Sequence, residues 1–222
     1  MFEFSRQTLF QWAARLLVLF TAMPVHECAH GLAADRLGDP TPRESGRLTL
    51  NPFKHLDFLG CAMIFFFGFG WAKPVMVDAR NFQHPRRDMA IVSVAGPGSN
   101  FLFAFVILVI YKISFGLWDG SPSVVTSAVF LILETMLITN LSIGVFNLIP
   151  MPPLDGSKIL GAFLPERAYW TLMRYERFIA LALLLCLWRG YLDAPLLFLT
   201  RGMYTAINWL TLPIDWLFGW NS

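Results

Sequence analysis

The sequence has few cysteines, and none are spaced for a thiolate metal site or a disulfide framework. Only Cys28, Cys61 and Cys186 occur in 222 residues, without any CxxC. A disulfide-stapled fold and a cysteine-ligated zinc site are therefore not indicated. Cys28 lies two residues from each of two histidines and points toward another face of the helix. We interpret it as a small apolar helix residue.

Charged residues are also scarce, at 14% of the chain against about 25% in soluble domains. Hydrophobic residues make up 56%, which predicts a membrane protein, and the net charge of +2 does not indicate nucleic-acid binding. The first eight residues, MFEFSRQT, lack the features of a signal peptide, so the first apolar segment is expected to be retained. No repeat or long polar block occurs, which predicts one transmembrane domain over residues 1–222.

Long apolar runs predict an all-α polytopic bundle. Because a helix needs about 20 apolar residues to cross the hydrocarbon core, three runs are expected to span the membrane. The first should be kinked or loosened at Pro24. After Arg177, two interrupted apolar segments predict one span plus an interfacial or tilted helix. The expected helices cover residues about 8–37, 89–114, 124–149, 178–188 and 196–212.

The apolar stretch at residues 56–71 is short and rich in glycine. Basic residues stand on both sides of it, and basic loops favour the cytoplasmic face. If both loops are cytoplasmic, the stretch re-enters the membrane, whereas a full crossing is the alternative. The neighbouring stretches GRLTL (46–50) and KPVMV (73–77) predict short membrane-associated β-strands.

The first apolar run ends in an HExxH motif, formed by His26, Glu27 and His30 within PVHECAHG. Two histidines four positions apart share one helix face and can bind the same metal ion. Glu27 is suited to take a proton from water, as in HExxH zinc hydrolases. Two core histidines that merely form hydrogen bonds are the alternative.

A catalytic zinc takes three protein ligands and keeps one position open, so HExxH leaves one ligand missing. Asp155 is the candidate, because it follows a predicted span within FNLIPMPPLDGSKIL and is braced by three prolines and Gly156. The basic loops bring His30 and Asp155 to the same face of the bilayer. The alternative is an aspartate that caps the next helix.

With these residues the chain resembles the site-2 protease family of intramembrane zinc metalloproteases, and most closely its small subgroup without PDZ or CBS domains. HExxH also occurs in unrelated zincins, but its combination with the proline-rich LDG motif is specific. Phe58 and Met76 depart from the common pattern, in which proline is frequent. The matching motifs, in the family's order over about residues 20–165, are HECAHGLAADRLGDPT, GRLTLNP, KHLD, GWAKPV, NFQHPRRDMA, AGPGSN and NLIPMPPLDG.

The resemblance implies roles for individual residues. His26, His30 and Asp155 would hold one zinc ion, and Glu27 would activate water. Asn147 is a candidate for binding the substrate backbone or a developing oxyanion, and Asn100 is a second such candidate. An asparagine that ties two helices together is the alternative for Asn147, and the glycines near Asn100 fit close helix packing with a bend.

The implied function is hydrolysis of peptide bonds in transmembrane substrates near the cytoplasmic side, as in regulated intramembrane proteolysis. The catalytic core would cover residues about 8–165, followed by C-terminal helices at about 170–222. The expected partners are the bilayer and a membrane-spanning protein, without nucleic acid, in a bacterial or archaeal plasma membrane. A metal transporter or metal sensor with the same histidines and aspartate is one rival. An inactive relative that acts as a membrane chaperone is another, against which the intact motifs argue.

Overall fold

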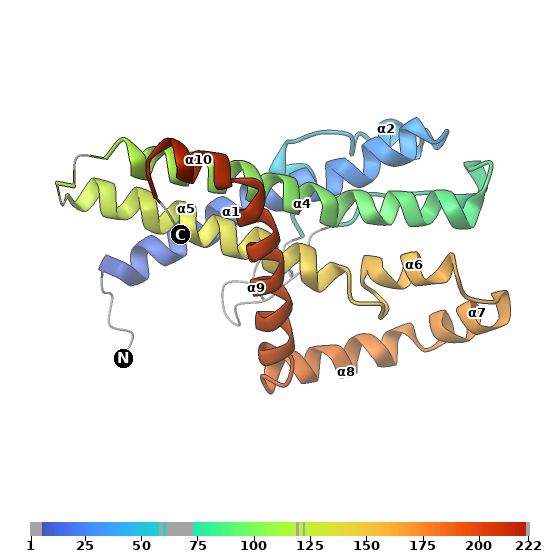
Figure 1. Ribbon diagram of the computed structural model, residues 1–222. Helices are drawn as coiled ribbons and strands as arrows, with labels where there is room; N and C mark the ends of the chain where they lie inside the picture. Colours follow the sequence, from blue (N-terminus) through green and yellow to red (C-terminus); the bar gives the residue numbers. More distant parts are fainter. Residues whose placement is uncertain (1–5, 58–59, 61–72, 119, 122, 221–222) are drawn as a thin grey trace.

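The computed structural model describes residues 6–57, 60, 73–118, 120–121 and 123–220, and this part of the chain is mostly helical. Three long helices form its centre: α1 (Arg6–Arg36), α4 (Pro85–Gly116) and α5 (Val124–Asn147). They run alongside one another in Figure 1, and each packs against the other two. The shorter helices are α2 (Thr41–Glu44), α6 (Asp155–Gly161), α7 (Glu166–Arg174), α8 (Glu176–Trp188), α9 (Asp193–Leu210) and α10 (Leu212–Leu217), with 3₁₀ turns at Pro52–Lys54 and Ala79–Asn81.

The two most apolar helices begin where the sequence carries N-terminal signals. Pro85 is the first residue of α4, where its missing N–H removes no helical hydrogen bond. Ser123 caps α5, because its hydroxyl accepts from the Thr126 N–H while the Thr126 hydroxyl accepts from the Ser123 N–H. Both starts lie within five residues of the predicted ones.

The helices confirm the predicted all-α membrane bundle in part: in the part of the chain that the structure describes, α1, which was expected to span the membrane, is not among the helices long and apolar enough to do so. Within the described residues, α4 and α5 are long and apolar enough to cross a membrane, and α8 with α9 passes the same test as a pair bent by 87°. The sequence had predicted one span plus a tilted helix there. At about 1.5 Å per residue, the 31 residues of α1 reach roughly 46 Å, and the helix continues through Pro24.

The largest apolar core lies where α9 crosses the long helices (Figure 1). Helix α9 packs against both α4 and α5 at this crossing. The buried members of the cluster are Ala104, Ile107, Leu108, Leu137, Leu141 and Ile207.

The predicted β-strands are wrong, because the described part of the chain contains no strand. Residues 48–49 form a bend, and residues 73–78 form neither helix nor strand. Side chains and a loop carbonyl take the backbone donors that a neighbouring strand would use: Lys73 N–H donates to His55 O at 2.7 Å, Val75 N–H to Glu27 Oε2 at 2.8 Å and Asp78 N–H to Asp39 Oδ2 at 2.8 Å. The predicted re-entrant stretch at 56–71 lies almost wholly outside the described residues.

Asp39 organises the loop after α1. Gly38, with φ of +103°, turns the chain out of the helix so that the next side chain enters the protein. The fully buried Asp39 carboxylate accepts from the N–H and hydroxyl of Thr41, from Asp78 N–H and from the Asn81 amide. Burial raises the pKa of Asp39, but these donors lower it more, so the net pKa lies below the usual value.

Candidate metal centre

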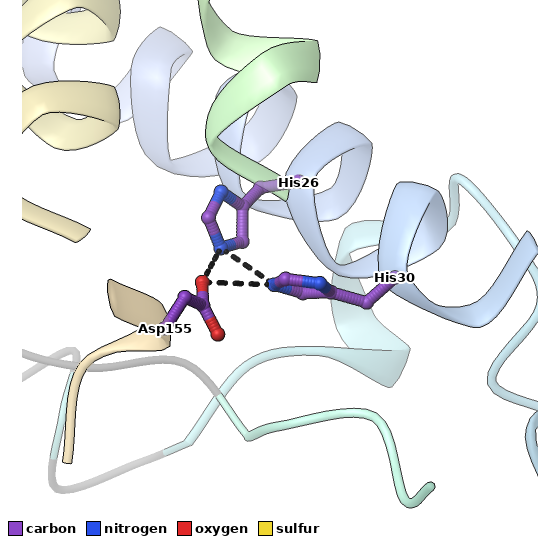
Figure 2. Close-up of side chains that lie close together, drawn as sticks. All are labelled: His26, His30 and Asp155. Carbon is purple, nitrogen blue, oxygen red and sulfur yellow. Dashed lines mark hydrogen bonds and ion pairs between the residues drawn. The ribbon is translucent and has the colours of Figure 1, made fainter. Parts of the chain in front are cut away.

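Three ligand atoms converge between α1 and α6. The Nε2 atoms of His26 and His30 lie 3.0 Å apart, and Asp155 Oδ2 lies 3.3 Å from the first and 3.1 Å from the second. All three side chains are more than nine-tenths buried. Figure 2 shows the carboxylate facing both rings. Within the described residues, this is the one group of three or more histidine, cysteine or acidic side chains arranged for a metal ion.

Local structure explains how residues 125 positions apart meet. His26 and His30 are one helical turn apart on α1, as the HExxH spacing predicts. Asp155 is the first residue of α6, and Gly156 lets this start approach the end of α5. A Cβ at Gly156 would lie 2.4 Å from Leu148 O and 2.3 Å from Ile149 O, so only glycine fits there.

The second oxygen of Asp155 has its own partner. Lys158 Nζ lies 3.5 Å from Asp155 Oδ1, one turn further along α6. The lysine side chain is 43% exposed, so the pair is partly screened by solvent. The carboxylate therefore turns one oxygen to a cationic side chain and the other to the histidines.

The hydrogen-bond partner of His30 fixes its tautomer. His30 Nδ1 lies 2.7 Å from the Val92 carbonyl oxygen on α4. A carbonyl only accepts hydrogen bonds, so Nδ1 carries the proton and donates. In the neutral ring, Nε2 then has no proton, and its lone pair faces His26 and Asp155.

A longer chain of hydrogen bonds fixes the tautomer of His26. The Met136 carbonyl accepts from Asn140 Nδ2 at 2.8 Å, so Asn140 Oδ1 faces the other way and accepts from Asn100 Nδ2 at 3.2 Å. Asn100 Oδ1 is thereby left for His26 Nδ1, at 2.6 Å. His26 Nδ1 is the donor, and the lone pair of Nε2 points into the centre.

The donor set fits zinc. Two neutral imidazoles and one carboxylate present three electron-pair donors to one point, an arrangement that needs a cation. Ligand atoms at about 2.1 Å from a tetrahedral ion lie about 3.4 Å from one another, close to the observed 3.0–3.3 Å. Three protein ligands also match the number in catalytic zinc sites, which keep a fourth position open.

Helix α4 closes one side of the centre through Gly96. A Cβ there would lie 2.3 Å from His30 Nε2 and 2.7 Å from His26 Cε1, so the rings pack directly on the glycine backbone. The glycine-rich AGPGSN motif predicts close helix packing here. The structure brings that packing onto the two histidines.

Glu27 lies beside His26 in α1, but its carboxylate is bound by a different part of the chain. Its carboxylate Oε2 accepts from the Val75 N–H at 2.8 Å, which ties it to the extended segment 73–78. Val75 is buried on this contact, while Met76 beside it is 62% exposed. One oxygen of Glu27 is thus held by the backbone of a segment that passes the centre.

The remaining candidates have structural partners. Asn147 Nδ2 donates to Ile143 O of its own helix at 3.0 Å, so this bond does not tie two helices together. Asn100, predicted to bind substrate, hydrogen-bonds His26 and Asn140. His55, a buried histidine outside the predicted ligand set, bonds Thr49 O at 2.8 Å.

Sequence reasoning missed two polar residues near the centre. Asn140, fully buried in α5, orients Asn100, and Asp39 anchors the segment that holds Glu27. A signal for Asn140 was present, because an amide within an apolar span needs a hydrogen-bond partner. Asp39 gave no such signal, since aspartate after a helix and before proline is common in turns.

Comparison with known proteins identifies the family. The family model "Peptidase family M50" matches residues 121–187, which include Asp155. "Putative zinc metalloprotease YwhC" of Bacillus subtilis (strain 168) is 38% identical over 152 residues, 68% of this chain and 68% of that protein. The chain belongs to peptidase family M50. It is a zinc metalloprotease of this family, and its cofactor is Zn²⁺.

Two more distant relatives carry similar names. "Putative zinc metalloprotease Rip2" of Mycolicibacterium smegmatis is 31% identical over 137 residues, which cover 60% of this chain and 50% of that protein. "Zinc metalloprotease MJ0392" of Methanocaldococcus jannaschii is 25% identical over 156 residues, 70% of this chain and 36% of that protein. The chain thus spans half or less of these two relatives. No solved structure matches the chain.

Proposed function

We propose that this M50 protease is an intramembrane enzyme that cleaves membrane-spanning protein substrates near the cytoplasmic side of a bacterial or archaeal plasma membrane. Its zinc ligands are His26, His30 and Asp155, and Glu27 is the general base. The single domain has its catalytic core at about residues 8–165. The convergence of three buried ligand atoms, from His26, His30 and Asp155, carries this proposal.

The depth of the centre supports cleavage inside the membrane. His30 lies six residues before the end of α1 at Arg36, which is about 9 Å along the helix axis. The basic residues 36, 43 and 47 follow at this end, and α4 and α6 contribute basic residues 86, 87 and 158 there. Basic segments favour the cytoplasmic face, so the centre lies just inside that boundary.

In the mechanism, the chain's residues orient the reactants and move the proton. When bound, zinc supplies a Lewis acid that polarises the scissile carbonyl and makes water acidic near neutral pH. Glu27 takes a proton from the attacking water and later gives it to the leaving amine. The Val75 N–H holds Glu27 Oε2, which leaves Oε1 for this proton transfer.

Substrate binding is assigned to the extended segment 73–78. A transmembrane helix must unwind before hydrolysis, because its carbonyls are hydrogen-bonded within the helix. This segment holds Glu27 through the Val75 N–H and exposes Met76, which places it to contact such an unwound peptide. Asn147, eight residues before Asp155 in sequence, remains the candidate for binding the substrate carbonyl as charge develops.

Cleavage and metal content measured together test this function. The wild type and Glu27→Gln are co-expressed with a single-span reporter, and zinc is measured in the purified proteins. Glu27→Gln is expected to retain one zinc per chain and to lose cleavage. A metal transporter predicts instead that reporter cleavage is absent in both proteins. Cleavage by Glu27→Gln at the wild-type rate would exclude the assigned base.

A further inference from the structure

The side-chain amide of Asn140 in α5 is buried, and the proposed hydrolysis gives it no role. Asn140 is fully buried in the middle of an apolar helix, 40 residues after Asn100 and on a different helix. A polar side chain at this depth is unfavourable unless its groups are hydrogen-bonded. Both ends of the Asn140 amide are used, one by Met136 O and the other by Asn100.

The two histidines differ in the kind of group that fixes their tautomers. The partner of His30 is the Val92 backbone carbonyl, which cannot exchange an oxygen for an N–H. The partner of His26 is the side-chain amide of Asn100, whose oxygen and nitrogen exchange places when the amide flips. Only His26 therefore needs a further residue to hold its partner in one orientation.

A flip of Asn100 would oppose metal binding. The flipped amide presents its NH₂ group to His26 Nδ1, so Nδ1 must accept and the proton moves to Nε2. The Nε2–H bond then points at Asp155 and His30, where the ion belongs. The orientation of one amide thus decides whether His26 offers a lone pair or a proton.

We propose that Asn140 is a positioning residue of the metal centre. It holds Asn100 in the orientation that keeps His26 protonated at Nδ1 and unprotonated at Nε2. The Met136 carbonyl starts this series: because a carbonyl can only accept a hydrogen bond, it pairs with Asn140 Nδ2 and so directs Asn140 Oδ1 at Asn100. This inference rests on the proposed function, since His26 is a ligand only in that assignment.

The helix α5 also provides a matched control. Thr139, beside Asn140, donates its hydroxyl hydrogen to Thr135 O of the same helix at 2.7 Å. Thr139→Val removes a side-chain hydrogen bond at the neighbouring, half-buried position and leaves the bond between Asn140 and Asn100 in place. Asn140→Leu keeps the branched shape of the side chain and removes both polar groups of the amide. Asn140→Asp restores an acceptor toward Asn100 whether the carboxyl is ionised or neutral.

Two measurements on the full-length, detergent-purified protein test the proposal. Chelator competition gives the zinc dissociation constant. Nitrogen-15 spectra of the metal-free protein report which ring nitrogen of His26 carries the proton, with the signal assigned by loss in His26→Ala. Neither measurement depends on cleavage of a substrate.

Asn140→Leu is expected to weaken zinc binding about tenfold. This is the lower end of the loss that is typical when residues that hydrogen-bond to metal ligands are replaced. Its His26 spectrum should show a mixture of tautomers, whereas the wild type and Thr139→Val show Nδ1–H. Asn140→Asp should recover most of the affinity. In an Asn100→Leu background, the Asn140→Leu change should add nothing further.

Several results would overturn the proposal. One is an Asn140→Leu protein with the zinc affinity and His26 tautomer of Thr139→Val. Another is a full tenfold loss that persists in the Asn100→Leu background, because the effect would not pass through Asn100. The two proposals fail separately. If His26→Ala binds zinc as tightly as the wild type does, the proposed ligand set is wrong. The tautomer spectrum of the wild type and Asn140→Leu would still test whether Asn140 orients Asn100.

Discussion

Replacing Gly96 by alanine perturbs the centre by a single methyl group. The rings of both histidines lie against this glycine, and the new Cβ would lie 2.3 Å from His30 Nε2. Ordinary van der Waals contact begins at 3.4 Å. The His30 ring must therefore move by about 1 Å, or α4 must withdraw from α1 by a similar amount.

The size of this shift sets the expected loss. Metal–ligand distances are held within about 0.2 Å, so a displacement near 1 Å removes His30 from a bound ion. A misplacement of 1 Å in an active site also lowers rates by about 100-fold. We expect Gly96→Ala to lower zinc affinity and reporter cleavage by about 100-fold or more.

The same helix supplies the control. Gly98 lies two residues further along α4, and a Cβ there would meet no atom within 4 Å. Alanine is favoured over glycine in a helix interior by about 1 kcal/mol, so Gly98→Ala should be neutral or slightly stabilising. Zinc per chain, the zinc dissociation constant and cleavage are measured for both variants. Melting of the metal-free proteins separates damage to the centre from loss of the fold.

The reasoning is refuted if Gly96→Ala binds zinc and cleaves the reporter as Gly98→Ala does. The rings would then not lie against α4 as described. Equal loss in both variants would also refute it, because the effect would come from any methyl group on this helix and not from the contact with the histidines.

Three further changes test the surroundings of the centre. Gly156→Ala should reduce zinc binding at least about tenfold, because the new methyl group would press on two backbone carbonyls and displace Asp155. A zinc affinity equal to that of the wild type would contradict this. Val75→Pro removes the N–H that holds Glu27 and should lower cleavage about tenfold while zinc is retained, whereas Val75→Ala keeps the donor and should stay active. Because the folded-state pKa of Asp39 is lowered, its stabilising effect is present above about pH 4 and is lost below it. Melting curves of Asp39→Asn should show about 1–3 kcal/mol less stability at pH 7 and a flatter dependence between pH 5 and 3, and a curve parallel to the wild type would count against this.

The long helices α4 and α5 and the candidate metal site could be predicted from sequence, because each depends largely on the local pattern of residues. Apolar runs of helical length predict α4 and α5 whatever surrounds them. The HExxH spacing puts His26 and His30 on one face of any helix, and the need for a third ligand leads to Asp155 after the prolines. The structure brings these three side chains together.

The partners of these residues were not predictable, because they depend on how separate helices pack. Nothing in the sequence relates His30 to the Val92 carbonyl, 62 residues away, or His26 to Asn100, 74 residues away. The same limit explains the wrong strands. The stretch at 73–77 has the extended pattern of a strand, but side chains from α1 and the following loop take backbone donors that a paired strand would use.

The most direct test of the central claim is zinc X-ray absorption on the full-length protein. The account predicts one zinc per chain, bound by two imidazole nitrogens at about 2.0–2.1 Å and by carboxylate or water oxygen at about 2.0–2.2 Å. The imidazole signal should halve in His26→Ala if any metal remains, and zinc should be lost in Asp155→Ala. A spectrum that is the same in Asp155→Ala and in the wild type would contradict the account.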